Sequence, residues 1–320
     1  SYLLYWGKTR KGERKVERAP CHLLAYHALD VAAVGELILS YDRHRKARLA
    51  KALDLDPEVF HLLFVFSLVL HDLGKFARSF QGQAEIAECD LVSPVPGKIY
   101  DGKHRGHTRL GTLLWDEVLR PKRQALRTGC FMTDLDLQES CSLWLGCFFG
   151  HHGQPVMGAC SPLEIDFLEE DFLAAEEFVS ALEALWGEPW PVDAFSDEHW
   201  RDSRLAPVTW ELAGLVTLAD WLGSNTEFFP CCVEPMLLEK YWENRALPQA
   251  QQVLAKTGFA RVPRPIAFPG FVKSFNLQPT PLQEWAASAT LAEEPQLMIL
   301  EDLTGSGKTE AALTLAHRFL

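Results

Sequence analysis

The stretch that decides the fold class is residues 56–76, DPEVFHLLFVFSLVLHDLGKF. Asp56 is a favourable N-cap and Pro57 suits the first position of a helix, so a helix is expected over Glu58–Leu70. The apolar part of this helix is too short to span a bilayer, which predicts a buried core helix. The pair His71-Asp72 follows at once, just before a glycine that suits a helix end. An ionisable pair at the end of a buried helix is the first indication of a functional site.

Helical spacing of apolar side chains dominates the rest of the first 260 residues, with almost no strand alternation. Helices or helical faces are expected over His22–Ser40, Arg43–Lys51, Thr108–Leu119 (ending before Pro121), Leu143–Phe149, Leu173–Trp186 and Trp210–Leu222. The basic N-terminal segment through Arg18 and the Gly- and Pro-rich residues 90–106 are expected to be loops. The fold class is therefore mainly α.

The net charge of the chain is less informative than it first looks. The 320 residues carry 31 Lys and Arg against 43 Asp and Glu, a net charge of −12, which argues against a nucleic-acid partner. Residues 161–200, however, contain twelve acidic residues and no Lys or Arg, so the remainder balances at 31 against 31. We expect this acidic stretch to be an outer face turned from the substrate or a contact with a protein partner, and the charge does not exclude DNA.

The length suggests two domains. The eight cysteines form no CxxC pair and are irregularly spaced, which favours reduced thiols in a cytoplasmic protein. Neither a signal peptide nor a membrane span is expected.

Seven ionisable side chains on separate segments form the first functional constellation. They are His27 in the first helix, His71 and Asp72, His107 after the Gly-rich loop, His151 and His152 between two glycines, and Asp220, the lone carboxylate of an apolar helix. Unpaired buried charges are costly, so such groups need one another or a cation. Ordinary core or surface roles are the alternative for each, and His22 competes with His27 as His104 competes with His107.

Imidazole and carboxylate together suit divalent transition metals, and this set exceeds the needs of one ion. It suits a two-metal site with a bridging carboxylate, which would activate water and clamp a phosphoryl group for hydrolysis of a phosphate ester. The ligand types favour Fe, Mn, Co or Ni, with Zn possible. Lys75, one turn from His71, is a candidate cation for the scissile phosphate, and a solvated lysine is the alternative.

A second constellation lies near the C-terminal end. Gln296–Leu300 predicts a buried strand that leads into Gly305-Ser306-Gly307-Lys308-Thr309 and a helix from Glu310. In such a loop, backbone N–H groups cradle phosphates, Lys308 reaches the β and γ phosphates and Thr309 binds Mg²⁺. Upstream, Gln283 can contact an adenine edge through two hydrogen bonds. Asp302 stands where the motif has its first glycine, and a fortuitous Gly-rich turn is the alternative.

The order of the seven ionisable residues resembles that of the HD phosphohydrolase superfamily. With PTPLQ at 279–283 and TGSGKTE at 304–310, essentially the whole chain resembles the N-terminal part of the CRISPR-associated helicase-nucleases of type I systems, most of all the type I-E branch. The strings that carry this resemblance are YWGK (5–8), YHALDVAAV (26–34), LHDLGKF (70–76), GHHG (150–153) and LADWLGS (218–224).

The resemblance implies an HD nuclease domain over residues 1–260, a linker over 261–280 and an N-terminal fragment of an α/β RecA-like P-loop domain over 281–320. It implies a metal-dependent endo- or exonuclease of single-stranded DNA, coupled in the full-length protein to a helicase that uses Mg-ATP, and recruited by an RNA-guided Cascade-type surveillance complex. One metal would take His27, His71, Asp72 and Asp220, and the other Asp72, His107, His151 and His152, with Asp72 bridging. Lys75 matches the family's lysine after the HD pair. ATP turnover is not expected from these 320 residues alone, because they contain no Walker B acid or second RecA-like domain.

Two other functions stay open at this point. An HD hydrolase of small nucleotides fits the ionisable residues but needs no P-loop, and a recruitment module with a vestigial metal site does not explain a full ligand set. Candidate contacts to a single strand are Trp6, Tyr26, Phe76, Phe80 and the basic stretch Lys8–Arg18, for which core packing and a solvated loop are the alternatives.

Overall fold

The computed structural model describes residues 1–9, 21–84, 86, 89–123, 135–153, 156, 162–259, 267–292 and 296–319. The chain divides into two compact units, residues 1–261 and 262–320. Each unit has its own hydrophobic cluster, a large one in the first and a small one in the second.

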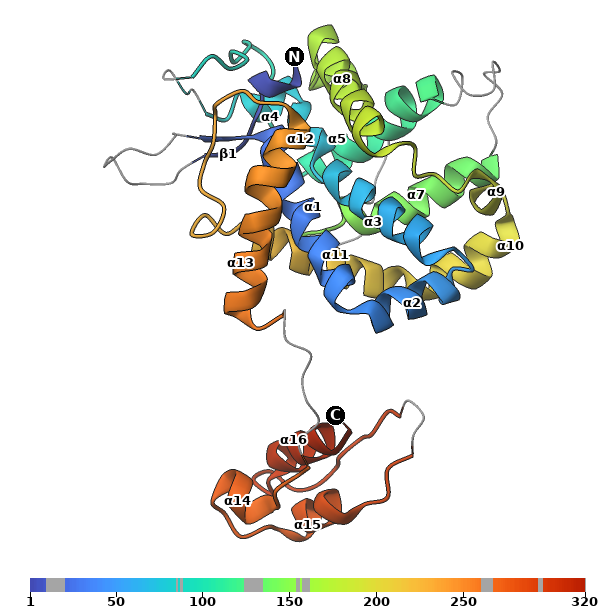
Figure 1. Cartoon of the computed structure of the whole chain (residues 1–320), viewed down its shortest axis with the longest axis vertical. Coiled ribbons are helices and arrows are strands. Elements are labelled where there is room, and N and C mark those ends of the chain that lie inside the picture. The colour runs from blue at the N-terminus through green and yellow to red at the C-terminus, as the bar shows by residue number, and fades with distance from the viewer. Residues whose placement is uncertain are drawn as a thin grey trace. The chain divides into compact units, whose positions relative to one another are not determined.

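The first unit is built almost entirely from helices (Figure 1), as the apolar spacing predicts. Its α-helices are α1 (Leu24–Tyr41), α2 (Arg43–Ala52), α3 (Pro57–Leu70), α4 (Arg78–Gln81), α5 (His107–Leu114), α7 (Leu135–Phe149), α8 (Glu169–Trp186), α9 (Val192–Phe195), α10 (Glu198–Trp200), α11 (Thr209–Gly223), α12 (Leu238–Tyr241) and α13 (Leu247–Thr257). Its 3₁₀ turns are η1 (Tyr2–Leu4), η2 (Leu73–Phe76), η4 (Leu163–Ile165) and η6 (Ala206–Val208), and its π-helical turns are η3 (Trp115–Leu119), η5 (Arg201–Leu205) and η7 (Trp242–Ala246).

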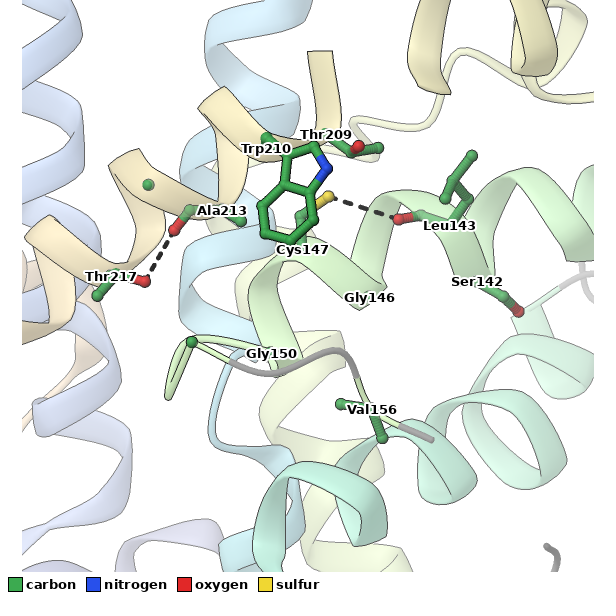
Figure 2. A pocket seen from close by; sticks show the side chains of 12 residues that line it. Ser142, Leu143, Gly146, Cys147, Gly150, Val156, Thr209, Trp210, Ala213 and Thr217 are labelled. Atoms are coloured by element: carbon green, nitrogen blue, oxygen red, sulfur yellow. Dashed lines mark hydrogen bonds between the residues drawn. The ribbon is translucent and has the colours of Figure 1, made fainter. Parts of the chain in front are cut away.

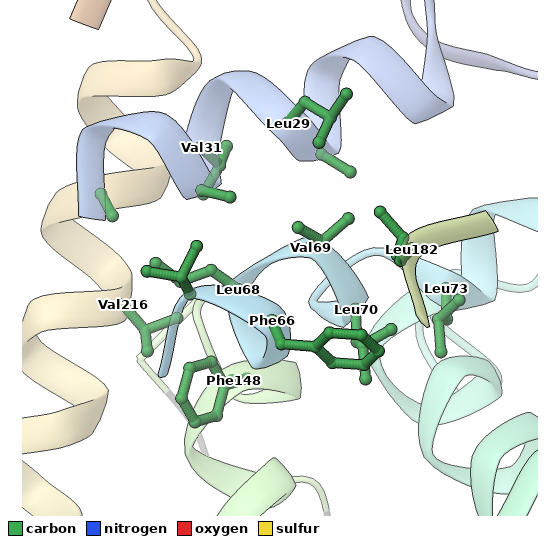
Figure 3. Packing of buried hydrophobic residues seen from close by; sticks show 14 of the residues in the cluster. Leu29, Val31, Phe66, Leu68, Val69, Leu70, Leu73, Phe148, Leu182 and Val216 are labelled. Carbon is green, nitrogen blue, oxygen red and sulfur yellow. The ribbon is translucent and has the colours of Figure 1, made fainter. Parts of the chain in front are cut away.

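Helix α3 is a core helix of this unit, and most of its residues are buried. The Asp56 side chain accepts hydrogen bonds from the first N–H groups of the helix, and Pro57 opens it, as predicted. Residues 57–76 are apolar enough to cross a membrane by length and composition, but 83% of that window is buried inside the structure, as for a core helix. Figure 3 shows Leu68 and Val69 among side chains of α1, α7 and α11. The end of α3 is thus held by packing on several sides.

Helix α1 approaches α3 closely because of one glycine. A Cβ on Gly35 would lie 2.1 Å from Leu68 Cδ1, so no larger residue fits without movement. One turn before Gly35 in α1, a Cβ on Gly223 of α11 would lie 2.7 Å from the Val31 Cα. These contacts fix α1, α3 and α11 against one another, and all three carry side chains of the site described below.

Two local predictions were wrong. Residues 1–9 are not a loop, because β1 (Trp6–Thr9) pairs antiparallel with β2 (Cys21–Leu23); residues 10–20 lie outside the described residues. The helix after His107 does not stop before Pro121 but continues through Arg123. The π-helical turn η3 precedes the proline, which then stands in the first turn of the resumed α-helix, where its missing N–H is not needed.

The acidic stretch 161–200 is only partly an outer face. Asp166 and Asp171 are fully buried and tie this stretch to the segments beside the HD pair. Asp171 pairs with Arg78 at 2.8 Å and Asp166 with Arg105 at 3.0 Å. The expectation of a detached acidic face is therefore wrong for these two carboxylates.

The second unit contains α14 (Phe271–Phe275), α15 (Pro281–Ser288) and α16 (Lys308–Phe319). Helix α14 lies in the range expected to be a linker. Residues 296–300 do not form the expected strand: Leu297 and Ile299 are 91% and 76% exposed, and no other strand is present in the described part of this unit. A strand needs a neighbour for its N–H and C=O groups, so the RecA-like fold stays a prediction.

Candidate metal centre

The structure brings together all seven ionisable residues that the sequence singled out. His27 comes from α1, His71 and Asp72 from the end of α3, His107 from the start of α5, His151 and His152 from the turn after α7, and Asp220 from α11. Two sets have ligand atoms within 4.8 Å of one another: His27, His71 and Asp72, and His107, His151 and His152. We call the first set together with Asp220 the inner group, and the second set the outer group.

Asp72 presents one carboxylate oxygen to the other inner ligands and one to the outer group. Its Oδ2 is 3.1 Å from Nε2 of both His27 and His71. Its Oδ1 is 3.5 Å from His107 Nε2 and 3.8 Å from His151 Nε2. A carboxylate placed in this way can bridge two cations.

Asp220 completes the inner group from the opposite side. Its Oδ1 is 3.8 Å from His71 Nε2 and 4.0 Å from His27 Nε2. The Ser224 hydroxyl, one turn further along the chain, donates to the same oxygen at 2.9 Å. This bond holds the carboxylate toward the two imidazoles.

The tautomers of two histidines follow from their backbone contacts. His71 Nδ1 lies 2.7 Å from the Leu68 carbonyl and His151 Nδ1 lies 2.9 Å from the Phe148 carbonyl. Because a carbonyl oxygen only accepts, each Nδ1 must carry the proton. In the neutral ring Nε2 then presents a lone pair to the centre, which is the usual arrangement of a metal-bound histidine.

Several buried polar atoms at the centre lack hydrogen bonds within the described part of the chain. Among them are His71 Nε2 and Asp72 Oδ1, both in residues that are at most 2% exposed. A lone pair on Nε2 facing a carboxylate oxygen at 3.1 Å is repulsive unless a proton or a cation lies between them. The residues therefore fit a pair of divalent transition metals, whose preferred ligands they are.

The electrostatics favour the metal-binding forms of most ligands. Burial lowers the pKa of His27 well below its usual value, that of His107 to about 3 and that of His151 to about 4, so these rings are neutral near pH 7. Burial alone would raise the pKa of Asp72, but Lys75 and His71 hold it well below its usual range. For His71, burial lowers the pKa while the Asp72 charge raises it above the usual value.

Lys75 is directed into the centre rather than into solvent. Its Nζ lies 2.6 Å from Asp72 Oδ2, donates to the Gly7 carbonyl at 3.2 Å and lies 5.6 Å from the centre of the Phe80 ring. In this position the ammonium balances the Asp72 charge.

The structure also distinguishes His27 and His107 from the two histidines that compete with them in the sequence. His22 Nε2 pairs with Asp30 at 2.8 Å and its Nδ1 accepts from the Cys232 N–H, so both ring nitrogens are engaged in another buried network. His104 is exposed and pairs with Asp101 at 3.0 Å. The centre contains His27 and His107 instead.

Three supporting residues at the centre were not predicted from the sequence. The Tyr100 hydroxyl lies 3.1 Å from His107 Nδ1 and accepts from the His107 backbone N–H at 2.9 Å. Lys8 donates to the Ser224 carbonyl at 2.7 Å, and burial lowers the pKa of Lys8 to about 8. Lys8 and Ser224 fall in the strings YWGK (5–8) and LADWLGS (218–224) that carry the family resemblance, whereas Tyr100 has no such signal.

Gly74 is a further supporting residue. A Cβ at this position would lie 1.8 Å from the His107 carbonyl oxygen and 2.5 Å from the Gly111 nitrogen. The HD turn and α5 therefore touch through backbone atoms. This contact brings the outer group within reach of Asp72.

The aromatic candidates for DNA contact are core residues. Trp6, Tyr26, Phe76 and Phe80 are each at most 7% exposed, so they present no free ring for stacking. Of the basic stretch, residues 10–18 lie outside the described residues.

The phosphate-loop candidates lie in the second unit. Gly305 and Gly307 have φ of +86° and +82°, and Lys308 begins α16, so the loop precedes a helix as expected. Lys308 Nζ donates to the Asp302 and Leu303 carbonyls at 2.8 and 2.7 Å, and Thr309 is exposed. The loop is closed on its own lysine in this structure.

Gln283 is tied to the same loop. Its side chain accepts from the Thr280 N–H at 2.9 Å and donates to the Gly307 carbonyl at 3.0 Å. Both ends of the amide are thus engaged within the protein, and the side chain is buried.

Sequence comparison with known proteins matches the chain to one protein family. The family model described as "Cas3, HD domain" matches residues 6–229. The chain is 29% identical to the CRISPR-associated endonuclease/helicase Cas3 of Escherichia coli (strain K12), over 99% of this chain and 36% of that protein. It is 30% identical to the protein of the same name from Thermus thermophilus, over 93% of this chain and 31% of that protein. The chain thus spans about a third of the length of these curated relatives.

Solved structures show the same likeness. The crystal structure of T. fusca Cas3 with AMPPNP matches with a TM-score of 0.57 and 26% identity, over 99% of this chain and 34% of that one. The Thermus thermophilus Cas3 HD domain, crystallised in the presence of Ni²⁺, matches with a TM-score of 0.52, over 82% of this chain and 94% of that one. At 20% identity, this second likeness shows the fold alone.

Proposed function

Because the chain belongs to the Cas3 HD-domain family, we propose that its metal centre hydrolyses phosphodiester bonds of single-stranded DNA with two divalent transition metals. The observation that carries this proposal is the position of Asp72, whose two carboxylate oxygens face two different sets of histidines. A one-metal site would leave one of these sets without a purpose.

When bound, the metals would lower the pKa of a water and stabilise charge on the phosphate. The inner ion would be held by His27, His71, Asp72 and Asp220, and the outer ion by Asp72, His107, His151 and His152. The protein's own part is to fix these ligands in advance, through the carbonyls of Leu68 and Phe148, the Ser224 hydroxyl and the Tyr100 hydroxyl. Fe, Mn, Co and Ni suit this ligand set, and Zn is a further candidate.

Lys75 has two roles in this proposal. In the metal-free arrangement it balances the Asp72 carboxylate, with which it makes its shortest contact. Once cations take over that task, its ammonium is free to turn toward a phosphate oxygen, where a fixed positive charge stabilises the negative transition state.

The wider context rests on the relatives, which are named endonuclease/helicase proteins. We propose that the second unit begins a helicase module in which Lys308, Thr309, Gly305 and Gly307 bind Mg-ATP and Gln283 contacts the adenine. The surveillance complex of RNA-guided CRISPR systems is the proposed partner, and the cytoplasm is the proposed location.

The test compares matched neighbouring histidines. Metal-free protein is loaded separately with Mn²⁺, Co²⁺, Ni²⁺, Fe²⁺ or Zn²⁺ and given labelled single-stranded DNA, duplex DNA or free nucleotides. We expect cleavage of single strands, loss of cleavage in His107→Gln and unchanged cleavage in His104→Gln. Turnover of nucleotides without cleavage of DNA would favour the small-nucleotide hydrolase instead, and equal activity of the two variants would contradict the assigned site.

A further inference from the structure

A cavity of about 490 Å³ lies between α7 and α11, next to the outer group (Figure 2). Gly150 and Gly153, which flank the two adjacent histidines, form part of its wall. Thr217 of α11 lines it as well and donates a hydrogen bond to the His151 carbonyl at 3.2 Å. The cavity and the metal centre are therefore on two sides of the same turn.

Two glycines within helices line this cavity at positions where a larger side chain would have room. Gly146 of α7 and Gly214 of α11 both line it, and no described atom would lie within 4 Å of a Cβ added at either position. At Gly35 or Gly223, by contrast, a Cβ would collide with a neighbouring helix. Glycine weakens a helix interior, and here close packing does not account for it. What the two glycines provide is empty space.

The walls suit a flat, uncharged ring. None of the described residues that line the cavity is charged, and Trp210 stands at its rim with 78% of its surface exposed. The hydroxyls of Thr209 and Thr217 donate to backbone carbonyls of α11 and of the turns beside it. The cavity can therefore recognise a ring by its shape and by stacking. The two threonine hydroxyls are already engaged and do not provide hydrogen bonds that would distinguish one base from another.

We propose that this cavity holds one base of the single strand whose phosphate is cleaved at the metal centre, with the base stacked on Trp210. The inference rests on the proposed nuclease function and adds to it a substrate contact. Single-strand binding proteins gain affinity from such stacking with little sequence preference, because every base has an aromatic face. The shared turn would set the distance between the bound base and the reacting phosphate.

The experiment measures binding separately from cleavage. A labelled short single-stranded oligonucleotide is titrated into the full chain in EDTA, so that no hydrolysis occurs, and fluorescence anisotropy reports binding. A second probe has the same backbone with abasic residues throughout. We expect Trp210→Ala to weaken binding of the ordinary probe at least fivefold, Trp210→Phe to retain it, and the abasic probe to bind both proteins equally weakly.

Filling the cavity gives an independent test that does not touch Trp210. Gly214→Leu places a side chain in open space and should weaken binding of the ordinary probe by a similar factor, whereas Gly214→Ala should leave it within twofold. Thermal unfolding and metal content serve as controls: the unfolding temperature should not fall below that of the wild type, because glycine weakens a helix interior, and the metal content should match. Gly146→Leu repeats the test from the opposite wall.

The outcomes separate this inference from the function on which it rests. If the wild type cleaves single strands with metal but Trp210→Ala and Gly214→Leu bind and cleave as it does, the cavity assignment is wrong and the nuclease proposal stands. If the ordinary and abasic probes bind the wild type equally, no base enters, and an apolar side chain of a partner protein becomes the better occupant. If the wild type does not cleave single strands with any metal, the function itself fails.

Discussion

The inner and outer groups have the same ligand chemistry but different surroundings. The inner group is enclosed, with His27, His71 and Asp72 at most 2% exposed. In the outer group His151 is equally buried, but His107 is only partly buried and His152 is exposed. A buried, rigid site favours permanent metal binding, while an open one allows exchange and access for a substrate. We therefore expect unequal affinities at the two positions.

The largest effect is expected where the two groups meet. Asp72→Asn removes the charge that both metals would share, while the shape of the side chain is kept. We expect single-strand cleavage to fall about a thousandfold or more, because the loss affects both ions at once. Asp30→Asn, an equally buried aspartate in a separate network, is the control and should keep cleavage. Retained activity in Asp72→Asn would show that the groups act independently.

The difference between the groups is tested next by one substitution in each. His71→Gln should weaken the tighter of two metal-binding steps, and His152→Gln only the weaker one. Calorimetric titration of metal-free protein measures both, and we expect each affected step to lose about 100-fold in affinity, since a ligand is lost outright. Equal affinities in the wild type would remove the distinction between the groups.

The contact that joins the groups can be strained without touching a ligand. Gly74→Ala would bring a Cβ to 1.8 Å from the His107 carbonyl oxygen. We expect a loss of about 2 kcal/mol or more in the free energy of unfolding, because packed backbone must shift. Gly146→Ala, which meets no described atom, should instead stabilise α7 by about 0.5–1 kcal/mol. Denaturant unfolding of both variants checks the contrast.

A smaller effect is expected from a residue that only orients the outer group. Tyr100→Phe removes the hydroxyl that contacts both the ring and the backbone of His107. We expect the weaker metal affinity to fall about tenfold and the stronger one to stay within twofold. A loss of affinity confined to the stronger metal-binding step would contradict the assignment of His107 to the outer group.

The smallest effect is expected from the second unit. Lys308→Ala should leave single-strand cleavage by this chain within twofold, because the lysine lies in the second unit and donates to carbonyls of its own loop. A large loss of metal-dependent cleavage would show that the P-loop contributes to the nuclease site.

The helices of the first unit were predictable because their signals are local. The Asp56-Pro57 start of α3 and the apolar spacing of α1 and α11 need no knowledge of the rest of the chain. The strand β1 was not predictable in this way, since its pairing depends on β2, and the expected strand at 296–300 failed because it has no described neighbour. Strands depend on partners, which a single segment does not reveal.

The site residues also divide into those that local sequence signals reveal and those that only contacts in the structure reveal. The seven ionisable residues could be found from the sequence because four of them stand in or directly after apolar helices and the other three stand beside glycines. His22 and His27 stand five positions apart, and only the family resemblance favoured His27; in the structure His22 pairs with Asp30 and His27 faces Asp72. Tyr100 and Gly74 act through contacts between distant segments, which no local pattern reports.

The central claim is that Asp72 bridges two metals, and the most direct test is electron paramagnetic resonance of the Mn²⁺-loaded protein. The account predicts two ions per chain at saturation with a spin-coupled signal, and loss of that coupling in Asp72→Asn. A single ion at saturation, or two ions whose signals show no coupling in the wild type, would contradict it.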